Sequence, residues 1–169
     1  MYAQTQIGTL LHEEHLHTLA ALQRLEAFLS RQGNRKAPDV GDAGVRDILS
    51  HLLTDVAAEV DRHFGFEEGH LFPVLNQRGE MGIAMILTEE HRTILPLAKD
   101  LAALAASALE AGGFSPEAWR DFHDRGGELC EREMFHIQKE EMGLLAAISM
   151  FVDAADDAEL AVAYRALQQ

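Results

Sequence analysis

The sequence of 169 residues contains one cysteine, four prolines and no long hydrophobic run. Cys130 has no partner for an internal disulfide, which suits a reducing cytoplasm. No apolar stretch approaches the ~20 residues that a membrane-spanning helix needs. Residues 1–11 lack a basic start followed by an apolar stretch, so we expect no signal peptide. These absences favour a cytoplasmic protein that is held together by its core.

Positive charge is also scarce. There are 14 Lys and Arg against 28 Asp and Glu, which gives a formal net charge of −14. Nucleic acids and anionic membranes both attract basic surfaces, so we expect neither as a partner. The length and the apolar content of 47% fit one globular domain. The unusual feature is nine histidines, which composition alone does not explain.

Helical periodicity dominates the chain, and no segment alternates convincingly like a strand. Glycine and proline signals divide it into four long helices, expected at residues 6–32, 45–76, 81–111 and 115–150. Long helices with short connections predict an all-α, up-down-up-down four-helix bundle. We expect residues 1–152 to form this bundle. Residues 153–169 would then form a short C-terminal helix or tail packed on it.

The two halves of the chain repeat each other. The apolar stripe that begins at Ile7 and Leu11 recurs with the same spacing at Ile83 and Leu87. The segment HFGFEE at residues 63–68 returns as HIQKEE at residues 136–141. The predicted bundle is therefore a duplicated helical hairpin.

A histidine interrupts the apolar stripe of one helix in each repeat, and the next helix carries His-x-x-x-Glu. Residues four apart lie on one helix face. Counted from the expected helix ends, the six side chains fall at one level of an antiparallel bundle, about 15 Å from one end. Buried imidazoles and carboxylates are costly unless something compensates them, and a metal ion compensates both. We therefore predict metal ligands at His15, His63, Glu67, His91, His136 and Glu140.

Four imidazoles and two carboxylates exceed the needs of one tetrahedral zinc ion and suit two ions. Each carboxylate has two oxygens and can bridge the pair. Mixed nitrogen and oxygen ligands favour iron or manganese, without excluding zinc.

Further histidines near these positions are candidates for a fifth histidine ligand. His70 lies three residues after Glu67, and its counterpart in the repeat is Gly143. His12, one turn before His15, is the weaker candidate. Four carboxylates flank the predicted ligands, and we expect them to face outward: Glu14, Glu68, Glu90 and Glu141.

The pattern resembles the hemerythrin-like (HHE cation-binding) family. The phrases EEHLHTL, HFGFEEGHLFPVL and EEHRTIL are similar to its repeat, and the resemblance extends to about residue 150. It implies two iron ions, oxo- or hydroxo-bridged, in a helical bundle. It also implies a small partner such as O2, NO or peroxide, with roles among oxygen binding, sensing of O2, NO or redox state, iron handling and repair of iron centres. Oxygen carriers in this family have a closely spaced pair of histidines on the third helix, whereas His91 has no second histidine four residues away. The resemblance is therefore to the bacterial and regulatory branches.

Three other functions compete with this interpretation. A ferritin-like di-iron oxidase would use Glu67-x-x-His70 and Glu133-x-x-His136. Those motifs lie at different heights, and their separation along the chain disagrees with that of the repeat. The other two are a metal-gated module that binds a partner protein and a plain metal store. Assembly into a homo-oligomer is also possible. No nucleophile–base pair or phosphate loop stands out, so we expect a metal- and small-ligand-binding protein rather than a dedicated enzyme.

Overall fold

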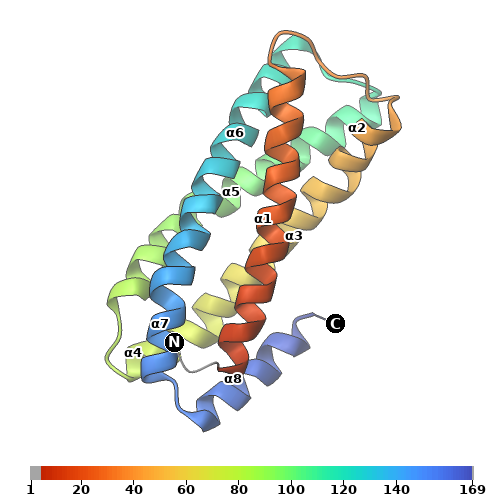
Figure 1. Cartoon of the computed structure of the whole chain (residues 1–169). Helices are drawn as coiled ribbons and strands as arrows, with labels where there is room; N and C mark the ends of the chain where they lie inside the picture. Colours follow the sequence, from red (N-terminus) through yellow and green to blue (C-terminus); the bar gives the residue numbers. More distant parts are fainter. Residues whose placement is uncertain (1–4, 169) are drawn as a thin grey trace. The chain divides into compact units, whose positions relative to one another are not determined.

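The structure is a computed structural model that describes residues 5–168, apart from the side chain of residue 52. Every regular element of these residues is helical (Figure 1), which confirms the all-α prediction. None of the helices in this part is both long and apolar enough to cross a membrane. The helices are α1 (Gln6–Gln32), α2 (Ala43–Asp47), α3 (Leu53–Phe66), α4 (Phe72–Gln77), α5 (Gly82–Ala111), α6 (Pro116–Lys139), α7 (Leu145–Phe151) and α8 (Ala154–Ala166).

Three π-helical turns join some of these helices end to end. They are η1 (Ile48–Leu52), η2 (Glu67–Leu71) and η3 (Glu140–Leu144). Helical backbone therefore continues from residue 43 to 77 and from residue 116 to 151, close to the predicted second and fourth helices. The π turns themselves were not predicted, because the apolar pattern of a sequence does not reveal them.

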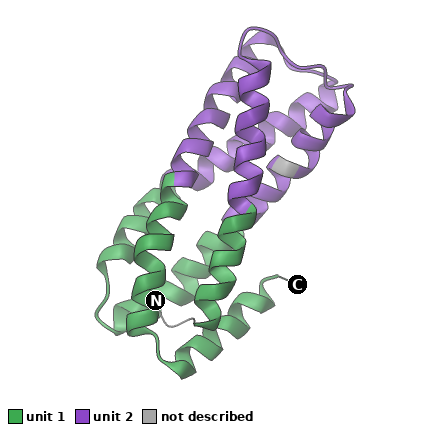
Figure 2. Cartoon of the chain, in the orientation of Figure 1, with its two compact units in different colours: residues 1–17, 61–92, 135–169 green, residues 18–60, 93–134 purple. Residues whose placement is uncertain are grey.

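The chain forms two compact units (Figure 2). The first comprises residues 1–17, 61–92 and 135–169, and the second comprises residues 18–60 and 93–134. Residues 1–4 and 169, which belong to the predicted bundle and tail, lie outside the described residues. Each unit gathers segments that are distant in the sequence, so its packing depends on tertiary contacts.

The core of the first unit draws on several separate parts of the chain. Ile7 and Leu11 of α1 pack in one cluster with side chains of η2, α4, α5, α7 and α8. Full burial of each such aliphatic side chain contributes about 1.5–3 kcal/mol. The cluster includes Leu160 and Tyr164, so α8 is an integral part of this unit. The C-terminal helix expected from the sequence is thus present.

Polar contacts also attach α8 to the first unit. The carboxylate of Asp157 accepts hydrogen bonds from the backbone N–H groups of Gln6 and Ile7, both at 2.9 Å. These are N–H groups that the first turn of a helix leaves without an intrahelical partner. Arg78 contacts Asp153 at 2.6 Å and Asp156 at 2.5 Å. Because several contacts hold α8, its buried side chains are fixed in position.

The second unit has an aromatic centre. The Trp119 ring stacks on Phe122 with centroids 5.5 Å apart, and its Nε1 donates a hydrogen bond to the Gly33 carbonyl at 2.9 Å. Gly33 ends α1 with φ 65°, and Gly112 ends α5 with φ 77°. Both adopt the left-handed conformation that glycine tolerates best. The predicted helix ends at these glycines are confirmed.

Candidate metal centre

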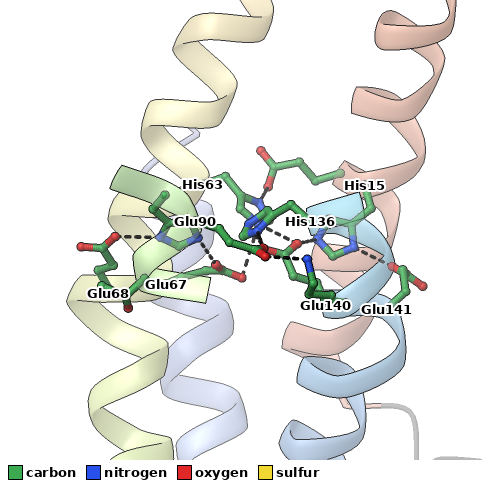
Figure 3. Close-up of polar contacts among 12 residues, drawn as sticks. His15, His63, Glu67, Glu68, Glu90, His136, Glu140 and Glu141 are labelled. Carbon is green, nitrogen blue, oxygen red and sulfur yellow. Dashed lines mark hydrogen bonds and ion pairs between the residues drawn. The ribbon is translucent and has the colours of Figure 1, made fainter. Parts of the chain in front are cut away.

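Six buried polar side chains converge inside the first unit (Figure 3). One histidine comes from each of α1, α3, α5 and α6, and one glutamate begins each of the π turns η2 and η3. Glu67, His136 and Glu140 have no exposed surface, and the other three are at most 7% exposed. The sequence predicted all six: His15, His63, Glu67, His91, His136 and Glu140.

The two glutamates lie between the four imidazoles. Glu140 Oε2 lies 2.7 Å from His15 Nε2 and 3.5 Å from His63 Nε2. Its Oε1 lies 2.7 Å from His136 Nε2. Glu67 lies 3.4 Å from His63 Nε2 through Oε1 and 3.2 Å from His91 Nε2 through Oε2. Each carboxylate therefore links imidazoles from different helices.

The inner nitrogens and oxygens lie close together, with contacts as short as 2.7 Å. The inner nitrogens of His15, His63 and His91 and both oxygens of each glutamate are buried, yet these contacts lack the geometry of hydrogen bonds. A buried polar group left unsatisfied costs about 1–3 kcal/mol. Cations between these atoms would satisfy the inner nitrogens and oxygens together.

Two sets of donor atoms are compact enough to hold a cation each. Within either set, the donor atoms lie within 4.8 Å of one another, and Glu140 belongs to both. Imidazole and carboxylate together suit first-row transition metals. The residues therefore fit a pair of cations that share Glu140. One set contains His15, His63 and Glu140, and the other contains Glu67, His91, His136 and Glu140.

Each imidazole has a second carboxylate on its outer side. In every case the contact is made by Nδ1, the ring nitrogen that faces away from the cluster. Ionised carboxylates only accept hydrogen bonds, so Nδ1 carries a proton, and Nε2 can offer its lone pair to a cation once any proton on it has left. The pairs are His15–Glu141 at 2.5 Å, His63–Glu14 at 3.1 Å, His91–Glu68 at 2.7 Å and His136–Glu90 at 2.8 Å.

The expectation that these carboxylates face outward holds only in part, because the Glu14 side chain is 8% exposed and all four contact a histidine. They follow the internal repeat, in which Glu14 is equivalent to Glu90 and Glu68 is equivalent to Glu141. Each lies directly beside a predicted ligand in the sequence. Neighbouring residues of a helix point in different directions, so one reaches inward while the next reaches a histidine of another helix. The repeated acidic doublets were the available signal.

Charges within the cluster reinforce one another. Burial raises the pKa of Glu140, but His136 and His63 outweigh it and hold that pKa well below its usual value. Burial lowers the pKa of His63, but Glu67 and Glu140 outweigh it and raise that pKa well above its usual value. Burial likewise lowers the pKa of His15, and Glu140 outweighs it, so the net pKa is raised. Without metal, protons therefore supply positive charge at the place where cations would bind.

An aromatic ring closes one side of the cluster. Phe64, which is 2% exposed, stacks on His91 with centroids 3.7 Å apart and an interplanar angle of 12°. It also makes an edge contact with His136 at 5.1 Å. This ring holds the imidazoles in place and excludes water from that side.

Two candidate histidines lie away from the inner cluster. His70 is exposed, stacks on Phe66 with centroids 5.7 Å apart, and belongs to neither donor set of the described residues. The structure therefore does not bring the proposed fifth histidine into the cluster. His12 is also exposed, and its Nδ1 contacts the outer carboxylate of Glu141 at 2.9 Å. The ferritin-like set is not assembled either, because Glu133 and His70 are absent from both donor sets.

The family model of the hemerythrin HHE cation binding domain matches residues 6–113. This match covers more than half of the chain, and it includes His15, His63, Glu67 and His91. The chain therefore belongs to the hemerythrin HHE cation-binding family, whose domains bind metal cations. No curated protein matches the chain significantly. His136, Glu140 and α8 lie beyond the matched residues, so only the internal repeat and the packing assign them to the cluster.

Proposed function

We propose that this protein holds a non-haem di-iron centre and uses it to bind or sense a small ligand such as O2 or NO. The observation that carries the proposal is the pair of donor sets sharing Glu140. The metal ligands would be the six residues of the inner cluster: His15, His63, Glu67, His91, His136 and Glu140.

The donor chemistry supports iron. His15, His63 and Glu140 form a group of two histidines and one carboxylate, the set that non-haem iron sites use while keeping positions open. When bound, an iron pair would supply those open positions and redox chemistry for a diatomic ligand. The outer carboxylates fix the tautomers of the histidines, and the Phe64 ring gives the site an apolar wall. Manganese or zinc are the alternatives that metal analysis would identify.

The repeat supports the larger architecture as well. We propose that the four long helical stretches form the up-down-up-down bundle expected from the sequence, because both halves of the repeat contribute equivalent residues to one cluster. A cytoplasmic location belongs to the same proposal, since a single buried cysteine needs no oxidising compartment.

The test is a titration of reduced, iron-loaded protein with O2 and with NO, followed by absorption spectroscopy. A new spectrum that reverses when the gas is removed supports ligand binding. Continuous consumption of peroxide or NO would instead identify an enzyme, and an unchanged spectrum would identify a metal store. A variant lacking both His63 and His136 is the control for iron bound elsewhere.

A further inference from the structure

The outer carboxylates of the four histidines differ in the groups that hold them. Glu90 contacts Lys139 at 2.5 Å, and Glu141 contacts His12 at 2.9 Å. Glu68 is 45% exposed in its side chain. Glu14 is the most enclosed, with 8% of its side chain exposed. The inner ligands thus follow the repeat, while their outer surroundings do not.

Glu14 is held by groups on three sides. Its Oε1 accepts a hydrogen bond from Arg62 at 3.3 Å. Its Oε2 accepts from His63 Nδ1 at 3.1 Å and, through a very short contact, from the Tyr164 hydroxyl. An ionised carboxylate only accepts hydrogen bonds, so the hydroxyl donates. One oxygen of Glu14 therefore joins Tyr164 to His63.

Tyr164 comes from α8, which has no counterpart in the internal repeat and lies outside the matched family domain. Its ring is 6% exposed and makes an edge contact with Phe66, with centroids 5.2 Å apart. The contacts of Asp157 with α1 and of Arg78 with Asp153 hold the helix that carries it. The hydroxyl is thus presented to Glu14 from a fixed position.

We propose that Tyr164 is a positioning residue of the metal centre, which acts through Glu14 on His63 and so sets the properties of the cation position formed by His15, His63 and Glu140. This inference rests on the proposed two-ion centre. Orientation of the carboxylate fixes the His63 ring and its tautomer. Hydrogen bonds from Tyr164 and Arg62 also withdraw negative charge from Glu14, which makes the His63 imidazole a weaker electron donor.

The hydrogen bonds around Glu14 agree with this role, because the carboxylate accepts from Tyr164 and Arg62 as well as from His63. The equivalent carboxylate in the other half, Glu90, accepts a hydrogen bond from Lys139. The two cation positions should accordingly differ, although their inner ligands are alike.

The test is Tyr164→Phe in full-length protein loaded with ⁵⁷Fe. This change removes the hydroxyl and keeps the buried ring. One of the two ions should transfer to a competing chelator about tenfold faster than in the wild type. Tenfold is the lower end of the loss in metal affinity that follows removal of a group hydrogen-bonded to a metal ligand. In the Mössbauer spectrum one iron signal should change and the other should stay. Glu14→Gln should affect the same ion, more strongly.

Lys139→Met is the matched control, because it removes the contact to Glu90 and should affect the other iron signal. The inference is wrong if Tyr164→Phe leaves both release rates and both signals as in the wild type. It is also wrong if both ions are bound more weakly to the same extent while the metal-free variant unfolds at a lower temperature. That pattern would indicate a general loss of packing in the fold. Wild-type protein that binds no metal pair would instead refute the proposed function, before any variant is compared.

Discussion

Replacement of His63 by alanine gives a quantitative test of the ligand assignment. Its inner nitrogen lies 3.4 Å from Glu67 and 3.5 Å from Glu140, so it contacts both carboxylates. Without it, one donor set keeps only His15 and Glu140. We expect the metal content to fall from two ions per chain to one or none.

The magnitude follows from the linkage between binding and folding. Each ion present at 100 times its dissociation constant stabilises the folded state by about 2.7 kcal/mol. For a chain of this size, 1 kcal/mol shifts the unfolding midpoint by about 2–4 °C, so each ion should add about 5–11 °C. Wild-type protein should gain two such increments, and His63→Ala at most one.

Thermal unfolding is measured with metal and with a chelator, and the difference between the midpoints is compared among variants. This difference removes the effect of the cavity that alanine leaves in the metal-free protein. His70→Ala is the matched control, because His70 is exposed on the same helical stretch. It should keep both ions. Full metal content and a full increment in His63→Ala would refute the assignment, and loss of an ion in His70→Ala would restore the fifth-histidine hypothesis.

Three further predictions follow from the cluster and from the single thiol. Glu140→Gln should weaken both ions, because Glu140 belongs to both donor sets, while Glu67→Gln should weaken chiefly the ion near His91; metal analysis after dialysis would show equal losses if this is wrong. Because the pKa of His63 is raised on folding, protonated His63 stabilises metal-free protein. This stabilisation is complete below pH 6.5 and is lost as the pH rises through the folded-state pKa. Because the pKa of Glu140 is lowered on folding, ionised Glu140 stabilises the protein above pH 4.5, and this stabilisation is lost as the pH falls. Denaturant unfolding should therefore show the greatest stability between pH 4.5 and pH 6.5. Stability that rises steadily above pH 7 would contradict this. Burial raises the pKa of the Cys130 thiol to about 12, so alkylating reagents should modify it only as the chain unfolds, and rapid labelling of native protein would disagree.

The sequence predicted the inner cluster because two helical regularities coincide there. The spacing of four in His63 and Glu67 fixes a common face, and the repeat places the second pair at the same level. Both regularities are local or periodic, so they are visible without coordinates. The helix ends at Gly33 and Gly112 were predictable for a similar reason, since glycine tolerates the left-handed conformation.

The features that sequence reasoning missed depend on the path of the backbone. His70 was placed on the face of Glu67 by α-helical spacing, but η2 is a π-helical turn with a wider repeat, and it turns His70 to the exterior. Glu14 and Glu68 act on histidines of other helices, which only the packing brings into reach. Tyr164 reaches Glu14 because the docking of α8 carries it there, and no local pattern specifies that docking.

The most direct test is anomalous diffraction at the iron edge from crystals of the iron-loaded protein. We predict two iron peaks among the four inner imidazole nitrogens, with Glu140 bound to both ions and Tyr164 hydrogen-bonded to Glu14. A single peak, or peaks located away from these side chains, would contradict it.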